Sequence, residues 1–385
     1  MIKRKILFCK TQEKIQDVFI RKTQENNHYD YVDALRGLAI LGVIMVHTGQ
    51  YVTLFVPFIF KNFLNNGQMG VQLFYLASAL TLFLSMKNRT LKEQYPTKNF
   101  FIRRFFRIAP LYYMAIIYYL WQNGFGTRYW LGDATHISIE NILSNIFFLH
   151  GFNPYWINSL VPGGWSVGVE MMFYAILPFL FSKIKNINQA FNFFTITILT
   201  MTVLKNILNN FDPTNSNHLW GEYLYFYLPS QLPLFALGII LYFIIIERIS
   251  LTEISGKSLL VFSCILLGGL FIGKNIFFPR QVIFGIGFFI FAVAISRYKF
   301  KLIVNPLINY IGKISFSMYL IHFAILHWSS KFHFIDSVTN GVLNFCVRYL
   351  IVVVLTIIVS TLSYHIVEIP FQKIGKKIIK KGEST

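Results

Sequence analysis

The chain is built from repeated apolar runs of about twenty residues, separated by short polar segments. A helix needs about 20 predominantly apolar residues to cross the hydrocarbon core of a bilayer, so each run predicts a transmembrane helix. The apolar piece 141–150 is too short to span comfortably, and we expect it to be re-entrant or interfacial. The expected fold is an all-α transmembrane bundle with ten spans, at about 33–50, 68–86, 108–122, 164–182, 190–208, 227–246, 257–273, 278–296, 307–328 and 341–366.

The distribution of basic residues orients this bundle. If the N-terminus is cytoplasmic, 26 of the 35 Lys and Arg residues fall in cytoplasmic segments and five fall in the loops on the other side. Such an excess is typical of cytoplasmic loops, so both termini are expected in the cytoplasm. An eleventh span at 141–150 would put the basic C-terminal segment outside. Because the basic residues gather on the cytoplasmic segments, the net charge of +19 indicates contact with a membrane surface and not with nucleic acid.

Composition agrees with a membrane protein, since 55% of the residues are apolar and only 13% are charged. The expected organisation is a basic cytosolic tail over 1–30, a membrane domain over 31–371 and a basic cytosolic tail over 372–385, with Pro370 ending the last helix. The first segment lacks the apolar region of a signal peptide. The three cysteines are far apart and no cluster of metal ligands is apparent, so no metal is expected.

The first predicted span carries ionisable residues within an apolar stretch, YVDALRGLAILGVIMVHTGQ. Arg36 and His47 are eleven residues apart, so a helix places them on one face, about 16 Å apart along its axis. A charged residue within a span costs about 2.5–3.5 kcal/mol on insertion scales, which invites a functional interpretation. The two side chains would then line a pathway across the membrane. The alternative is structural, with Asp33 pairing with Arg36 and His47 hydrogen-bonded at the helix end.

A basic cluster, FFIRRFFRIAP, lies at the cytoplasmic mouth of the third predicted span. Arg103 and Arg107 share a helix face at i, i+4, and Arg104 and Arg107 are neighbours at i, i+3. Guanidinium groups bind phosphates bidentately, so the cluster suits a cytosolic ligand with several phosphates, such as a coenzyme A. The competing interpretation is a basic interfacial helix that binds lipid headgroups.

A polar stripe runs through GGWSVGVEMMFYAILP, at the start of the fourth predicted span. Ser166, Glu170 and Tyr174 recur at i, i+4 and i+8 and so share one face. A carboxylate more than one turn inside a span could orient an imidazole or hold a substrate hydroxyl. It could equally pair with Arg or His and join two helices.

A second stripe, in ISFSMYLIH, places Ser315, Tyr319 and His322 on one face of the ninth predicted span. His322 is either a second functional imidazole or a hydrogen-bonded packing residue. The longest outside loop, 123–163, is rich in aromatic residues, which suits either a sugar or a membrane-interface belt.

Together these stretches resemble acyltransferase family 3, integral-membrane enzymes that modify sugars and other acceptors at bacterial surfaces. The resemblance runs from about Tyr31 to Phe371. It rests on five motifs in order: the Arg-x10-His of Arg36 and His47; the RxxR of Arg104 and Arg107; the W-S-L/V-x-x-E-x-x-F-Y segment with Trp165, Ser166, Glu170, Phe173 and Tyr174; the SYxxYLxH segment, here with Phe316 in place of Tyr; and the closing VEIPF.

The resemblance implies an acyl-CoA donor, most often acetyl-CoA, presented from the cytosol, and an acceptor hydroxyl on a cell-envelope or secreted saccharide. His47 would act as the general base or be acylated itself, with Arg36 and Glu170 as the other catalytic candidates. Donor binding is expected at Arg36, Arg103, Arg104 and Arg107, and acceptor binding at Trp165, Ser166, Tyr174, Tyr319 and His322. The expected location is the cytoplasmic membrane, with lipids and a glycan as partners.

Some members of this family carry an additional C-terminal soluble domain. We expect none here, because a short basic tail follows Phe371, which leaves open whether the chain acts alone or hands acyl groups to a partner. The principal alternative from another functional class is a transporter or flippase for a lipid-linked glycan. It explains the spans and the aromatic loop but not the cytosolic arginines beside an Arg-x10-His helix. A non-catalytic scaffold would leave the intramembrane His and Glu residues without a purpose.

Overall fold

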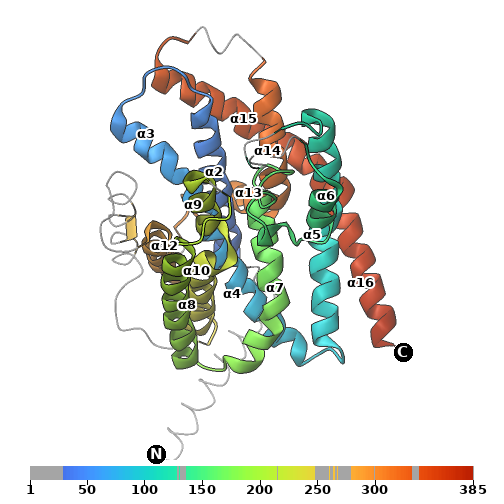
Figure 1. The fold of residues 1–385 in the computed structure, drawn as a ribbon. Helices are drawn as coiled ribbons and strands as arrows, with labels where there is room; N and C mark the ends of the chain where they lie inside the picture. Colours follow the sequence, from blue (N-terminus) through green and yellow to red (C-terminus); the bar gives the residue numbers. More distant parts are fainter. Residues whose placement is uncertain are drawn as a thin grey trace, which may run out of the picture.

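The computed structural model describes residues 29–127, 130, 136–214, 216–247, 260, 263–264, 267, 279–298, 300–331 and 338–384. Within these residues all regular secondary structure is helical, and no strand occurs (Figure 1). The α-helices are α2 (Asp30–Gln50), α3 (Phe58–Asn65), α4 (Gly70–Thr90), α5 (Pro96–Asn123), α6 (Ile139–Ile146), α7 (Gly164–Lys183), α8 (Ile187–Leu208), α9 (Asn217–Phe226), α10 (Leu228–Ile245), α12 (Arg280–Arg297), α13 (Pro306–Lys313), α14 (Ser315–Ser329), α15 (Gly341–Ser363) and α16 (Ile369–Glu383).

Seven helical stretches of the described chain are long and apolar enough to cross a membrane. They are Asp30–Gln50, Phe58–Thr90, Gly164–Lys183, Ile187–Leu208, His218–Ile245, Arg280–Arg297 and Gly341–Glu383. The prediction of a multi-pass helical membrane protein is therefore confirmed, whereas the count of ten spans is not. Among the other three, 108–122 lies within α5, 307–328 is interrupted, and 257–273 falls mostly outside the described residues, as does the N-terminal tail.

The expected span 307–328 is two helices, because the chain leaves helical geometry at Ile314 (φ −92°, ψ 8°). The first of them, α13, lies directly against α2. A Cβ added at Gly312 would meet the carbonyl oxygen of Asp33 at 1.8 Å, and one added at Gly37 would meet that of Ile308 at 2.4 Å. Backbones packed this closely require glycine, as is common between membrane helices. The break at Ile314 allows this contact and starts α14 as a separate helix.

The chain also remains helical beyond Pro370, where the sequence predicted an end. A π-helical turn, η5 (Tyr364–Glu368), separates α15 from α16, and proline is tolerated because it lies in the first turn of α16. The helix α16 runs beside α5, with Gly375 against Phe106 (Figure 1). At its end, Glu383 accepts hydrogen bonds from the backbone N–H groups of Gln94 and Tyr95, 2.8 and 3.0 Å away. The expected tail is therefore a helix anchored to the start of α5.

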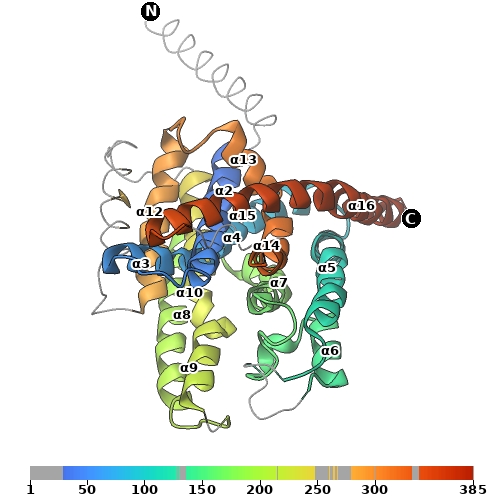
Figure 2. The same cartoon turned by 90° about the horizontal axis from the view of Figure 1, so that it is seen from above.

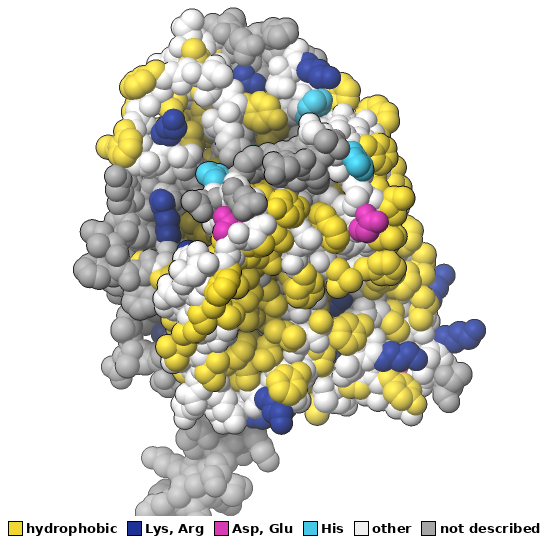
Figure 3. All heavy atoms as spheres, in the orientation of Figure 1, with side chains coloured by type: hydrophobic (Ala, Val, Ile, Leu, Met, Phe, Trp, Pro, Cys, Tyr) yellow, Lys and Arg dark blue, Asp and Glu magenta, His cyan; other side chains and the backbone are white. Residues whose placement is uncertain are grey.

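The piece 141–150, predicted not to span, forms the eight-residue helix α6 and the start of a 3₁₀ turn, η3 (His150–Phe152). Both are too short to cross a bilayer. On the face shown in Figure 3, a broad belt of hydrophobic side chains covers the middle of the molecule, and charged side chains lie mostly above and below it. This distribution matches a molecule surrounded by lipid.

The helix α2 lies inside the bundle, with α4, α12, α13, α14 and α15 in contact with it (Figure 2). Small residues allow this packing, since a Cβ on Gly42 would lie 3.2 Å from the carbonyl oxygen of Gly67 and one on Gly70 would lie 2.2 Å from that of Ala39. The helix that carries Arg36 and His47 is therefore the central element of the fold.

Candidate active site

Two cavities lie along α2, and each contains one of the two residues predicted from its sequence. Arg36 lines a small cavity of about 70 Å³, together with Arg104 and Arg107 of α5; we call it the arginine cavity. His47 lines a larger cavity of about 510 Å³, which we call the histidine cavity. The helix is continuous from Asp30 to Gln50, so the two residues are about 16 Å apart along its axis.

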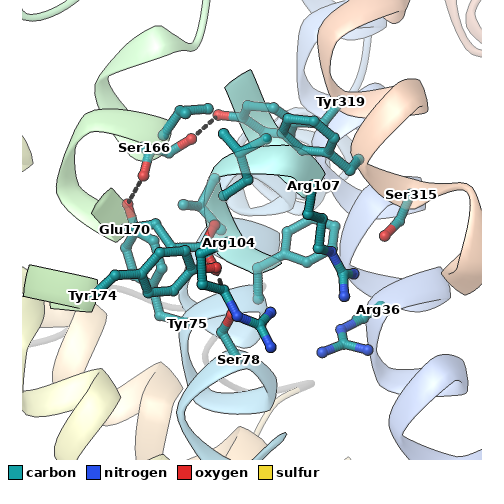
Figure 4. A pocket seen from close by; sticks show the side chains of 15 residues that line it. Arg36, Tyr75, Ser78, Arg104, Arg107, Ser166, Glu170, Tyr174, Ser315 and Tyr319 are labelled. Carbon is teal, nitrogen blue, oxygen red and sulfur yellow. Dashed lines mark hydrogen bonds between the residues drawn. The ribbon is translucent and has the colours of Figure 1, made fainter. Parts of the chain in front are cut away.

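The arginine cavity gathers side chains from five elements that are far apart in sequence (Figure 4). Arg36 donates from Nη2 to Thr81 Oγ1 of α4 over 2.9 Å, and its Nη1 lies 3.6 Å from Asp33 Oδ1. Arg104 lies over the ring of Tyr174, with its guanidinium carbon 5.7 Å from the ring centroid. The guanidinium groups are thus held by hydrogen bonds and an aromatic face, and they point into one space.

Glu170 is the one carboxylate on the wall of this cavity, among the described residues. It accepts hydrogen bonds from the hydroxyl of Ser78 and from that of Tyr174, the latter over 2.7 Å. These hydroxyls fix the carboxylate on the wall of the cavity that the arginines also line. Glu170 therefore lies in the arginine cavity and not beside His47, although its helix α7 contributes to both cavities.

The adjacent residues Arg103 and Arg104 of α5 have different surroundings. Arg103 lies outside the arginine cavity and donates from Nη1 and Nη2 to the two carboxylate oxygens of Glu93, over 2.8 and 3.1 Å. Burial alone would raise the pKa of Glu93, but hydrogen bonds from Arg103, Arg89 and Asn99 outweigh it and lower that pKa. Of the three clustered arginines, only Arg104 and Arg107 reach the cavity, because residues one position apart point about 100° apart around a helix.

His47 has an imidazole with one nitrogen committed and one free to react. Its Nδ1 lies 3.2 Å from Gln50 Oε1, one turn further along α2. An amide oxygen only accepts, so this contact assigns the proton to Nδ1 and leaves the lone pair of Nε2 available. His322 lies next to it, with the two ring centroids 5.4 Å apart.

His322 is fully buried behind His47 and lines neither cavity. Its Nδ1 bonds to the carbonyl oxygen of Met318 over 3.1 Å, which again assigns the proton to Nδ1. Phe323 covers both imidazoles, with its centroid 4.4 Å from that of His47 and 4.1 Å from that of His322. The fold thus brings together two histidines from helices α2 and α14.

The wall of the histidine cavity is mainly aromatic rings and amides, and it also includes the carboxylate residue Glu222. Trp165 lines it and stacks on Phe226 of α9, with the ring centroids 4.3 Å apart. The amide side chains come from five residues on several elements: Gln50, Gln68, Gln72, Asn123 and Asn158. Flat rings and amides that both donate and accept hydrogen bonds can bind a polyhydroxylated ligand.

Tyr319 lies where the two cavities meet. It lines both of them, and its hydroxyl is bonded to Ser166 (Figure 4). The same hydroxyl is bonded to the backbone carbonyl of Gly163. The predicted acceptor residues are therefore divided, since Trp165 faces the histidine cavity while Ser166 and Tyr174 face the arginine cavity.

Sequence reasoning missed the part that α4 plays. Ser78 and Tyr75 line the arginine cavity, Thr81 holds Arg36, and Gln72 lines the histidine cavity. Gln72, Tyr75, Ser78 and Thr81 recur every three residues, so a search for polar stripes within the second predicted span would have found them. Within the described residues, no group of three or more His, Cys, Asp or Glu side chains could hold a metal ion.

Comparison with known proteins gives one family and several relatives. Residues 29–365 match the profile of a family described as an acyltransferase domain. A Staphylococcus aureus (strain COL) protein, named provisionally as an O-acetyltransferase, is 26% identical over 388 residues, which cover 90% of this chain and 58% of that protein. The O-acetyltransferase OatA of Staphylococcus aureus (strain NCTC 8325 / PS 47) is 24% identical over 391 residues, which cover 91% of this chain and 59% of OatA. The chain thus spans about three fifths of the length of these relatives. No solved structure gives a significant match.

Proposed function

The chain belongs to the acyltransferase 3 family, and on this premise we propose that it moves an acetyl group from cytosolic acetyl-CoA to a hydroxyl of a cell-envelope or secreted glycan. The observation that carries the proposal is that two separate cavities lie along α2: one is lined by three arginines and the other by His47. An acyl-CoA has phosphates at one end and a reactive thioester at the other. These ends need different surroundings, and the two cavities offer one of each kind.

The donor is assigned to the arginine cavity. Arg36, Arg104 and Arg107 face a single cavity carboxylate, Glu170, so the cavity favours an anion. Guanidinium groups bind phosphate through paired hydrogen bonds. A cavity of about 70 Å³ is too small for a whole coenzyme A, so the phosphates lie at its mouth and the pantetheine arm enters. The excess of basic residues on the cytoplasmic segments supports an opening toward the cytosol.

The acceptor is assigned to the histidine cavity, which is about seven times larger. Its rings and amides match a sugar, which presents flat apolar faces and many hydroxyls. Trp165 is the residue that stacks on the acceptor, because its ring lines the cavity and is supported by Phe226. The names of the relatives, which state O-acetyl transfer, support a hydroxyl as the group modified.

His47 supplies the base. The Nε2 lone pair takes the proton of the acceptor hydroxyl as its oxygen attacks the thioester carbon, and the same proton passes to the departing sulfur. One C–O bond forms, one C–S bond breaks, and free coenzyme A leaves. In the second route, Nε2 attacks the thioester carbon, an N–C bond forms and the C–S bond breaks, so coenzyme A departs as the thiolate; the acceptor oxygen then displaces Nε2, and the hydroxyl proton passes to the thiolate. Both routes need the proton on Nδ1, where Gln50 holds it.

Glu170 takes a different role from the one expected, since its carboxylate lies among the arginines. We assign it to positioning Arg36 and Arg104, with Tyr174 as the hydroxyl that fixes it. His322 is assigned a packing role, because its ring lies against the imidazole of His47. The protein would act as a multi-pass protein of the cytoplasmic membrane, with ten spans and both termini inside.

Mass spectrometry of surface glycans tests this function directly. Cells would carry the wild-type chain, His47→Ala or an empty vector. We expect one acyl mass increment that is present only with the wild type, and its size identifies the acyl group. No acyl difference, combined with a changed amount of surface glycan, would contradict the proposal and favour a transporter of lipid-linked glycan.

A further inference from the structure

We propose that Tyr319 is the residue that selects the length of the acyl group, by closing the passage between the arginine cavity and the histidine cavity. The inference rests on the proposed function. Of the described residues, Tyr319 is the one that lines both cavities. A thioester that enters among the arginines must pass its ring to meet His47.

The ring is held in the closed position by a lock of two hydrogen bonds at its hydroxyl. Tyr319 donates to the carbonyl oxygen of Gly163 over 3.0 Å and accepts from the hydroxyl of Ser166 over 2.8 Å. Gly163 has φ +75°, and a Cβ there would lie 3.0 Å from the Tyr319 hydroxyl. Only glycine combines this backbone conformation with this contact. The start of α7 is thus shaped around the tyrosine.

Aromatic rings pack on both sides of Tyr319 and define where it can move. On the side of the arginine cavity, Phe74 meets it edge to face at a centroid distance of 6.2 Å. On the other side, His322 lies 5.9 Å away and is itself beside His47. A ring that is only 7% exposed and packed in this way has few alternative positions. The gap that opens when it turns is therefore small and of fixed size.

A small gap discriminates by length. An acetyl group needs less room than a propionyl or butyryl group, and one methylene in a tight apolar passage changes a rate by about 10- to 200-fold. The closed ring also separates the thioester from the water of the larger cavity. Without it, water attacks the thioester carbon, which yields a carboxylic acid and free coenzyme A.

Purified wild type and three variants would test this assignment with acetyl-, propionyl- and butyryl-CoA. Tyr319→Ala removes the ring, Tyr319→Phe keeps the ring without its hydrogen bonds, and Ser166→Ala removes one half of the lock. Tyr310→Phe is the matched control, because Tyr310 bonds to Thr361 over 3.0 Å and lines neither cavity. Two quantities are measured: the rate of acyl transfer to a glycan extract prepared from the membranes, and the rate of thiol release from the acyl-CoA without any acceptor.

We expect Tyr319→Ala to reduce the preference for acetyl over butyryl by at least about 10-fold and to raise acceptor-independent thiol release. Tyr319→Phe and Ser166→Ala should keep the preference and raise thiol release by about 2- to 5-fold, a loss of one or two hydrogen bonds. Tyr310→Phe should resemble the wild type in both measurements.

The inference is overturned if the wild type transfers acetyl groups and the Tyr319 and Ser166 variants keep both its donor preference and its thiol release. If Tyr319→Ala does not fold, the inference is judged on the thiol release of Tyr319→Phe and Ser166→Ala, and unchanged release in both overturns it. Absence of transfer from every donor by the wild type is a different result, since it overturns the proposed function itself.

Discussion

The arginine cavity and the histidine cavity share one helix but are built in different ways. In the first, hydroxyls fix the charged groups, as in the contacts of Arg36 with Thr81 and of Glu170 with Ser78 and Tyr174. In the second, rings and amides form a wide wall around His47, whose own partner is on the next turn of its helix. A small cavity with fixed charges defines its ligand closely, whereas a wide cavity lined mostly by rings and amides tolerates several ligands. Our proposal is accordingly more specific for the donor than for the acceptor.

A second contrast lies within α5, where neighbours in sequence have separate functions. Arg104 faces the cavity, while Arg103 holds the loop between α4 and α5 through Glu93. Glu93 also binds Arg89 over 2.8 Å, so this carboxylate is the centre of a structural cluster. The basic segment that resembles a single binding motif thus divides between the cavity, which Arg104 faces, and a structural cluster, which Arg103 joins.

The strongest test of the division between the cavities is His47→Ala. We expect turnover of acetyl-CoA with a glycan acceptor to fall by about 10²- to 10⁴-fold, the usual contribution of a general base. Donor affinity, measured by calorimetry with coenzyme A in detergent, should change by less than about 2-fold, because we propose that the phosphates bind at the other cavity. His327→Ala is the control, since that histidine lines neither cavity. An active His47→Ala protein would remove the base from this mechanism.

The reverse pattern is expected for Arg104→Ala compared with Arg103→Ala. Loss of Arg104 should weaken coenzyme A binding by about 10- to 100-fold, because hydrogen bonds to charged groups contribute about 1.5–3 kcal/mol each. Loss of Arg103 should leave that affinity within about 2-fold and lower the thermal stability, since Glu93 loses its bidentate partner. The measurement is calorimetric titration with coenzyme A, followed by thermal unfolding. Equal losses of affinity in both variants would show that the cluster binds the donor as a whole.

Much of this arrangement could be predicted from the sequence, because helix periodicity fixes it. The eleven-residue separation of Arg36 and His47 determines their shared face, and the spacing of Ser166, Glu170 and Tyr174 predicts one stripe. What periodicity does not give is the rotation of one helix against another. For that reason the position of Glu170 among the arginines, and of Arg103 outside them, required the packed structure.

The breaks in helices escaped prediction for a related reason. Residues 307–328 are apolar enough overall to predict one span, and this prediction does not treat the pair Gly312 and Lys313 as the end of a helix before Ile314. The break goes together with the packing of Gly312 on the backbone of α2, a contact between segments almost 280 residues apart in sequence. The same break affects the number of spans inferred from hydropathy, because 307–328 is predicted as one span and forms two helices.

Trp165→Ala sharpens the acceptor side of the comparison. A stacked aromatic pair contributes about 0.5–1.5 kcal/mol, so we expect glycan acylation in cells to fall by about 3- to 10-fold. Donor affinity of the purified protein should stay unchanged, because the ring lines the histidine cavity alone. Trp328→Ala, an exposed tryptophan of α14, is the matched control. A change in donor affinity with normal acylation would place the tryptophan on the donor side.

A last expected effect is on stability and not on either cavity, and it concerns His150, which lies between α6 and α7, outside the candidate spans, and supports the start of α7. Its Nε2 lies 3.0 Å from the carbonyl oxygen of Gly164, and burial lowers its pKa from 6.5 to about 4. In the unfolded chain His150 binds a proton near pH 6.5, whereas in the folded chain it stays neutral at that pH. The contribution of His150 to the free energy of unfolding is therefore fully present above pH 6.5. It is lost as the pH falls toward 4, by about 3 kcal/mol at most. Thermal unfolding in detergent should show this loss in the wild type and a shallower pH dependence in His150→Asn. Parallel pH profiles would mean that His150 does not titrate with folding.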